Sequence, residues 1–157
     1  MLFRSLLTAK PKDAAAHVQV AEWLRSIDRT DEAIALYRRA IELAPQEAQY
    51  REALGEFLFA LDRKADAIAT WREIASGSRK SAESFSRVGQ LLKNHDDVAG
   101  AIAAYAEAIK LESRVADLLT LARLQRESKQ FDASVKHIEQ AGSLAESQED
   151  QIGRAHV

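Results

Sequence analysis

One pattern of small and apolar residues occurs four times along this chain at an almost constant interval. The pair Val20-Ala21 recurs at steps of 34, 34 and 33 residues, as Leu54-Gly55, Val88-Gly89 and Leu121-Ala122. With the same spacing, four small residues are each followed four positions later by a large one: Ala33 and Tyr37, Ala67 and Trp71, Ala101 and Tyr105, Ser134 and Ile138. A fixed period of this length is typical of proteins that stack one supersecondary unit many times.

Each repeat has the pattern of a helix hairpin. Its apolar residues fall at helical spacing in two groups, separated by polar turns such as those at 26–30 and 94–97. Six glycines and two prolines among 157 residues are too few for the many turns of a β-sandwich or barrel. Small residues such as Gly55 let two helices approach while Trp71 fills the space beside them. Because one hairpin cannot bury both of its faces, we predict an all-α chain of stacked hairpins.

These residues resemble the tetratricopeptide repeat (TPR), a helix–turn–helix unit of about 34 residues. The resemblance is clearest over 14–47 and is carried by Val20-Ala21, Leu24, Ala33, Tyr37, Ala40 and Pro45. It implies a right-handed α-solenoid of antiparallel helix hairpins. The sequence departs from the family pattern at the closing proline, which is replaced by Arg79, Ser113 and Glu146, and at Arg51, where a bulky apolar residue is common.

The repeat register predicts the organisation of the chain. We expect a single TPR-like solenoid over 1–150, with a half-repeat at 1–13 and repeats at about 14–47, 48–81, 82–114 and 115–148. The half-repeat is indicated by residues one period before Tyr37, Ala40, Leu43 and Pro45, namely Phe3, Leu6, Ala9 and Pro11. Residues 151–157 are expected to be a disordered tail or a sequence artefact, because 152–157 read like a translated sequencing adapter. On that interpretation, the chain is a fragment of a longer TPR array.

Several classes of chemistry have no support in the sequence. There is no cysteine, and the histidines, His17, His95, His137 and His156, lack the spacing of a metal site. No glycine-rich phosphate loop and no GxSxG motif are present. We therefore predict no catalytic, cofactor-binding or metal-binding residue, and a protein that is not an enzyme.

Charge and hydropathy bear on partners and location. Lys and Arg number 22 against 24 Asp and Glu, so the net charge of −2 gives no field that attracts a phosphate backbone. No apolar segment is long enough for a signal peptide or a membrane span. We expect neither nucleic acid nor a membrane as a partner, and a soluble protein for which the cytoplasm is slightly favoured.

The resemblance also implies a binding surface, because the first helices of TPR hairpins line a concave groove that holds an extended peptide or a partner helix. The groove positions carried over to this chain are Val18, Glu22, Arg25, Glu52, Glu56, Phe59, Ser86, Arg87, Gln90, Lys93, Leu119, Arg123 and Arg126. Such a groove is acidic in its first half and basic in its second. These charges either select a ligand of complementary charge order or merely keep the face soluble.

One TPR class binds the carboxylate of chaperone tails with Lys and Asn in its leading repeat. This chain has Val18 and Glu22 there, so that clamp is not expected.

The predicted function is a non-catalytic protein–protein interaction or scaffold module that binds a protein or peptide of unknown identity in the concave groove. Two alternatives stay open. In the first, the repeats form the substrate-recognition segment of a larger, possibly enzymatic, protein. In the second, they self-associate through the uncovered ends of the array, around Phe3 and around Val135, Ile138 and Leu144.

Overall fold

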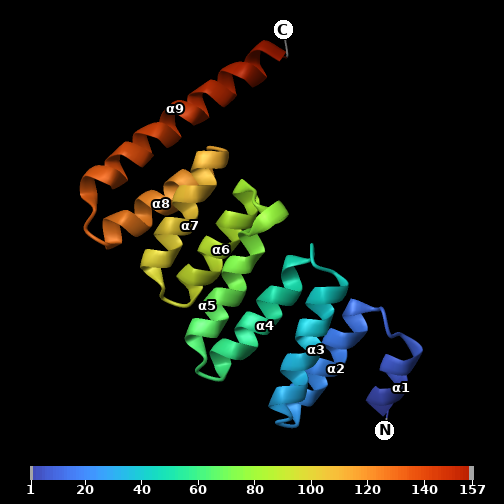
Figure 1. Cartoon of the computed structure of the whole chain (residues 1–157). Helices are drawn as coiled ribbons and strands as arrows, with labels where there is room; N and C mark the ends of the chain where they lie inside the picture. The colour runs from blue at the N-terminus through green and yellow to red at the C-terminus, as the bar shows by residue number, and fades with distance from the viewer. Residues whose placement is uncertain (1, 156–157) are drawn as a thin grey trace. The chain divides into compact units, whose positions relative to one another are not determined.

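The computed structural model describes residues 2–155, and it describes the side chains of residues 5–149. Within 2–155 the secondary structure is helical throughout, without a strand (Figure 1). The helices are α1 (Leu2–Ala9), α2 (Ala14–Ser26), α3 (Thr30–Leu43), α4 (Ala48–Ala60), α5 (Lys64–Arg72), η1 (Glu73–Ala75), η2 (Gly77–Arg79), α6 (Ala82–Asn94), α7 (Val98–Leu111), α8 (Val115–Glu127) and α9 (Phe131–Ala155).

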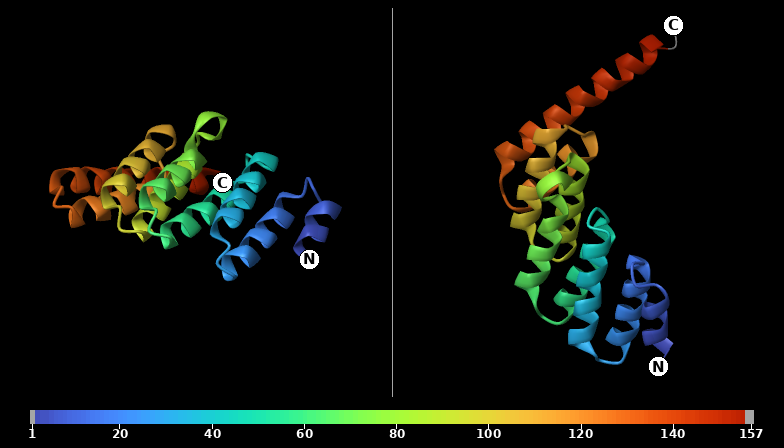
Figure 2. Two further views of the ribbon diagram at one scale, coloured as in Figure 1. Left: turned by 60° about the horizontal axis from the view of Figure 1, so that its bottom comes forward. Right: turned by 45° about the vertical axis from the view of Figure 1, so that its right-hand side comes forward.

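The chain divides into two compact units, Met1–Ile74 and Ala75–Val157. In unit 1, α2 pairs with α3 and α4 with α5, while α3 also packs against α4 and α1 against α2. In unit 2, the pairs are α6 with α7 and α8 with α9, and α7 packs against α8 (Figure 2). Each unit is thus a stack of antiparallel helix hairpins with its own core.

The four hairpin turns share one backbone conformation. A residue with φ between 58° and 61° lies in each turn: Asp28, Asp62, Asp96 and Lys129. The amide that follows each of them donates back across the turn to a carbonyl in the last turn of the first helix, at 2.8–2.9 Å. This is the bond pattern of a Schellman motif, which ends a helix with one left-handed residue.

The small and large residues of the repeat meet inside the hairpins α4–α5 and α6–α7, as the sequence predicts. A Cβ atom on Gly55 would overlap the indole of Trp71, and one on Gly89 would lie 2.8 Å from the ring of Tyr105. Trp71 is fully buried, and Tyr105 is 4% exposed. Ile138 has the same register but is 51% exposed. Helix α7, which carries Tyr105, packs against both α6 and α8, whereas α9 packs mainly against α8.

The second repeat closes differently from the first. Helix α5 ends at Arg72 and is followed by the two short 3-10 helices, with Gly77 at φ +57°. Arg51, which replaces a bulky apolar residue, is buried and donates from Nη1 to the carbonyl of Pro45 at 2.8 Å. The arginine therefore satisfies the carbonyl of a loop residue where an apolar side chain would only fill space.

The last helix is longer than the repeat register predicts. Helix α9 runs from Phe131 to Ala155 and so includes 151–155, where a disordered tail or an artefact was expected. Extending an existing helix costs little, because each added residue gains one backbone hydrogen bond without a new nucleus. Residues 156 and 157 lie outside the described residues.

Candidate functional site

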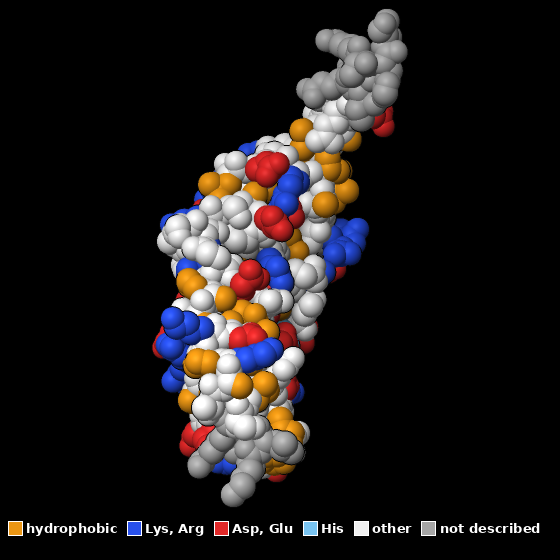
Figure 3. Space-filling view, turned by 90° about the vertical axis from the view of Figure 1, so that its right-hand side faces the viewer, with side chains coloured by type: hydrophobic (Ala, Val, Ile, Leu, Met, Phe, Trp, Pro, Cys, Tyr) orange, Lys and Arg blue, Asp and Glu red, His pale blue; other side chains and the backbone are white. Residues whose placement is uncertain are grey.

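The candidate site is the surface of the first helices, here called the first-helix face of each unit. Unit 1 presents Val18, Glu22 and Arg25 on α2, and Glu52, Glu56 and Phe59 on α4. Unit 2 presents Ser86, Arg87, Gln90 and Lys93 on α6, and Leu119, Arg123 and Arg126 on α8. Figure 3 shows one side of the molecule, on which acidic and basic side chains are interspersed.

On α2, two of the predicted groove residues are held by contacts within unit 1. The hydroxyl of Tyr37 donates to the carboxylate of Glu22, whose other oxygen lies 3.4 Å from Arg25 Nη1. The guanidinium of Arg25 also lies over the ring of Phe57, 5.4 Å from its centroid. Burial raises the pKa of Tyr37 above its usual range, and the hydrogen bond to Glu22 raises it further. Tyr37 therefore remains a hydrogen-bond donor at neutral pH and orients Glu22.

On α4, Phe59 belongs partly to the core. Its ring stacks on Trp71 with centroids 5.9 Å apart, and Lys64 Nζ lies 5.7 Å from its centroid. Glu52 is half-buried, and its backbone carbonyl accepts from Trp71 Nε1 at 3.4 Å. Glu56, in contrast, is exposed. Glu22 and Glu56 are therefore the carboxylates that this face presents most openly to solvent.

A pocket of about 380 Å³ lies between α6 and α8 on the first-helix face of unit 2. It is lined by Glu83, Ser86, Arg87, Gln90, Tyr105, Arg114, Ala116 and Asp117. Three predicted groove residues, on α6, are thus brought together there. The other four predicted residues of unit 2 do not line the pocket: Lys93, Leu119, Arg123 and Arg126.

A hydrogen-bonded ion pair forms one wall of this pocket. Arg114 donates to Asp117 Oδ2 from Nε at 2.8 Å and to Ser86 Oγ from Nη2 at 2.7 Å. Ser86 in turn donates to Asp117 Oδ2 at 2.8 Å. Asp117 is only 7% exposed, and its charge is compensated by the guanidinium of Arg114 and the hydroxyl of Ser86. The network joins α6 to α8 and holds the pocket wall rigid.

Sequence reasoning missed Arg114 and Asp117. The signal that could have found them is their spacing of three residues at the start of a helix, which allows an ion pair. That spacing is common on exposed helix surfaces, and only the contact with Ser86 from the preceding hairpin distinguishes this pair.

Tyr105 lies on the floor of the same pocket. Its hydroxyl donates to Gln90 Oε1 at 3.3 Å, and Gln90 donates to Asn94 Oδ1 at 2.6 Å. Burial raises the pKa of Tyr105, the negative charge of Asp117 raises it further, and Arg123 opposes both. Arg123 is thus close enough to act on the pocket electrostatically although it does not line it.

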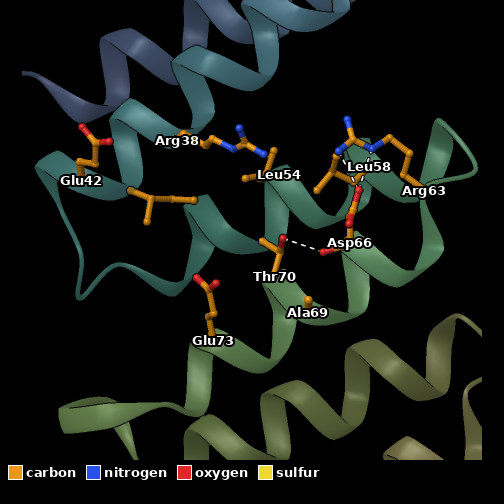
Figure 4. A pocket seen from close by; sticks show the side chains of 10 residues that line it. Arg38, Glu42, Leu54, Leu58, Arg63, Asp66, Ala69, Thr70 and Glu73 are labelled. Carbon is orange, nitrogen blue, oxygen red and sulfur yellow. Dashed lines mark hydrogen bonds and ion pairs between the residues drawn. The ribbon is translucent and has the colours of Figure 1, made fainter.

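A second pocket, of about 390 Å³, lies in unit 1 between α3, α4 and α5 (Figure 4). It is lined by Arg38, Ile41, Glu42, Leu54, Leu58, Arg63, Asp66, Ala69, Thr70 and Glu73. Arg63 donates to Asp66 Oδ2 at 2.8 and 2.7 Å, and Thr70 Oγ1 donates to the carbonyl of Asp66 at 2.8 Å. These groups satisfy one another along the helix, which leaves little polar capacity for a ligand.

In the part of the chain that the structure describes, no three His, Asp or Glu side chains are grouped so as to hold a metal ion. Within the same residues, every helix is too short or too polar to cross a bilayer.

A family profile for the tetratricopeptide repeat matches residues 13–57. Over these residues, the chain matches the tetratricopeptide-repeat family. No curated protein sequence matches it.

Solved structures are similar in fold over most of the chain. A crystal structure of MamA superposes with a TM-score of 0.62 at 18% identity, covering 94% of this chain and 81% of that one. MamA from Desulfovibrio magneticus RS-1 gives 0.59 at 14% identity, with 93% and 83% covered. YrrB, described as a TPR protein with an unusual peptide-binding site, gives 0.53 at 15% identity, with 91% and 74% covered. The predicted fold class, an all-α TPR-like solenoid, is confirmed.

Proposed function

We propose that this chain is a non-catalytic interaction module whose first-helix faces bind an extended peptide or a helix of a partner protein. A binding role follows from the chemistry of these faces, since they offer fixed polar groups and exposed charges. YrrB, which shares the fold, is described as having a peptide-binding site, and this supports the same class of function here.

The observation that carries the proposal is the pocket between α6 and α8. Its wall is held by the hydrogen bonds among Arg114, Asp117 and Ser86, so a ligand meets groups that are already positioned. Arg87 borders it, and Tyr105 closes its floor. A rigid pocket with a few convergent polar groups is the form that specific binding sites usually take.

The charge of each face suggests which peptides it would select. In unit 2, Arg87, Arg123 and Arg126 are exposed, and Leu119 adds an apolar side chain that is 49% exposed. A peptide with acidic residues beside an apolar one is complementary to this face. The exposed carboxylates of unit 1, Glu22 and Glu56, favour basic residues instead.

The test is peptide selection from a display library by the wild-type chain and by charge-reversed variants. Arg87→Glu together with Arg123→Glu is expected to remove the acidic peptides that the wild type enriches. Glu56→Lys is expected to remove basic ones. Because all three side chains are exposed, the thermal melt should change little.

Arg39→Glu is a matched control. Arg39 is an exposed arginine on α3, outside both first-helix faces, and its ion pair with Glu42 has 50% and 64% exposed side chains. If the selected peptides stay the same in the charge-reversed variants of the first-helix faces but change in Arg39→Glu, the peptides bind outside those faces. The module would act in the same way whether it works alone or as the recognition segment of a larger enzyme.

A further inference from the structure

Helix α9 carries an apolar stripe that faces solvent. Phe131, Val135 and Ile138 are 59%, 54% and 51% exposed, although they are among the largest apolar side chains of unit 2. Their spacing of four and three residues places them on one side of the helix. Large apolar side chains gathered in this way mark an interaction surface more often than isolated ones do.

Unit 2 itself shows how an equivalent stripe is covered. One period earlier, the same three positions on α7 are occupied by Val98, Ile102 and Tyr105. The first two of these are half-buried and Tyr105 is 4% exposed, and α7 packs against α8. The same three positions are therefore more buried on α7, which packs against both α6 and α8, than on α9.

The stripe on α9 also has an acidic border, which α7 lacks. Asp132, Glu139 and Glu146 follow at intervals of seven residues and are exposed. Seven residues are nearly two full helical turns, so these carboxylates form one row beside the stripe, about 10 Å apart along the axis. Lys136 lies on the same side of the helix, beyond this row.

One period earlier, the residues are Ala99 and Ala106 on α7 and Ser113 just after it. A helix that packs beside these small residues needs no basic side chain opposite them. On α9, the three carboxylates can pair with basic residues of a covering helix. The acidic row therefore specifies the chemistry of the helix that would cover the stripe.

We propose that α9 docks one amphipathic helix of a partner protein, with its apolar side on Phe131, Val135 and Ile138 and with Lys or Arg residues opposite the acidic row. This is a helix-in-groove mode of recognition, read through residues three and four apart. The site lies on the last helix of unit 2 and does not include any residue of the first-helix face, so it is independent of the function proposed above.

The test uses two fluorescent synthetic helical peptides and measures binding by anisotropy. Both carry Leu at helical spacing; one has Lys beside the Leu row and the other has Glu at the same places. The wild-type chain is expected to bind the Lys peptide more tightly. Ile138→Gln should weaken that binding about tenfold, because it removes a large apolar contact.

Charge reversal tests the acidic row. Glu139→Lys should weaken binding of the Lys peptide about two- to fivefold and strengthen binding of the Glu peptide. Glu112→Lys makes the same change of charge at an exposed position after α7 and should leave both affinities unchanged. Circular dichroism of each variant confirms that the helices are intact.

Three results would overturn the proposal: equal affinity for the two peptides, a Glu112→Lys effect as large as that of Glu139→Lys, or no effect of Ile138→Gln. Sedimentation, which measures the oligomeric state, gives a fourth result that would overturn it. A wild-type dimer that Ile138→Gln converts to a monomer would show that a second copy of this chain, and not a partner helix, covers the stripe.

Discussion

At the residue scale, the packing of this protein depends on pairs in which a missing side chain makes room for a large one. Gly55 and Trp71 are such a pair, since the indole occupies the space of the absent Cβ. The indole is fully buried and stacks on Phe59, so it has no free direction in which to move. The identity of one residue in the first helix thus determines whether the second helix can approach.

Gly55→Ala tests this pair. In most helix interiors, replacing Gly by Ala is stabilising, but here the methyl group would overlap Trp71. We expect the free energy of unfolding to fall by about 1–3 kcal/mol, as for overpacked cores, measured by urea denaturation. Gly142→Ala is the control, because nothing lies within 4 Å of the added Cβ and a gain of about 0.5–1 kcal/mol is expected. Stabilisation by both substitutions would contradict the packing.

At the element scale, each hairpin relies on one left-handed residue to end its first helix. Asp tolerates this conformation through its short polar side chain, but Lys does not. Lys129, at φ 61°, is therefore the residue with the greatest backbone strain among the four turns. The hairpin of α8 and α9 keeps the same turn as the others at some cost in stability.

Lys129→Gly should relieve that strain. We expect the unfolding free energy to rise by about 1 kcal/mol, and Asp96→Gly to give a smaller gain. Lys129→Ala keeps the left-handed penalty and serves as the control, so it should give no comparable gain. Equal midpoints for the Gly and Ala variants in thermal melts would contradict the role of the turn.

The contact between α8 and α9 also makes stability depend on pH. His137 Nδ1 lies 2.8 Å from Gln125 Oε1, so the ring donates to the amide, and burial lowers the pKa of His137. A lowered pKa means that the folded state favours neutral imidazole. The stability that neutral His137 contributes is therefore fully present above the pKa of about 6.5 that histidine has in the unfolded state. It is lost as the pH falls below that value.

Urea denaturation at pH 7.5 and pH 5.5 checks this linkage, since most carboxylates stay ionised over that range. We expect the protein to be less stable at pH 5.5. His137→Gln should reduce that difference, because it removes the group that binds the extra proton. A pH dependence that is identical in the variant would assign the effect to other groups.

At the scale of the whole molecule, the two units have separate cores and distinct spectroscopic probes. The two tryptophans of the chain, Trp23 and Trp71, both lie in unit 1, whereas helices of both units contribute to circular dichroism. Repeat proteins gain their stability from single repeats and from contacts between neighbours, so local destabilisation need not spread. Tryptophan fluorescence therefore reports on unit 1 alone.

Gly89→Ala uses this difference. The new Cβ would lie 2.8 Å from the ring of Tyr105, which destabilises unit 2. We expect the urea transition followed by circular dichroism to broaden toward lower concentration, while the fluorescence transition stays in place. Equal shifts in both signals would mean that the two units unfold as one.

The fold could be predicted from the sequence because the repeated pattern of small and large residues describes contacts within single hairpins. Gly55 and Trp71, or Gly89 and Tyr105, are 16 residues apart in the sequence and meet by local helix pairing. Helical periodicity and a small residue opposite a large one are enough to predict such contacts. The family assignment depends on the same local pattern.

The site needed the tertiary structure, because its contacts join different hairpins. Ser86 and Asp117 are 31 residues apart, and their hydrogen bond depends on how α6 and α8 pack together. Even within one hairpin, the sequence predicted Glu22 as a groove residue but could not show that Tyr37 holds its carboxylate. Burial also needed the structure: the periodicity groups Ile138 with Tyr105, but Ile138 is 51% exposed and Tyr105, on a helix that packs against both α6 and α8, is 4% exposed. A periodic sequence determines what each repeat forms, whereas the neighbours of each surface determine which of its residues remain available for binding.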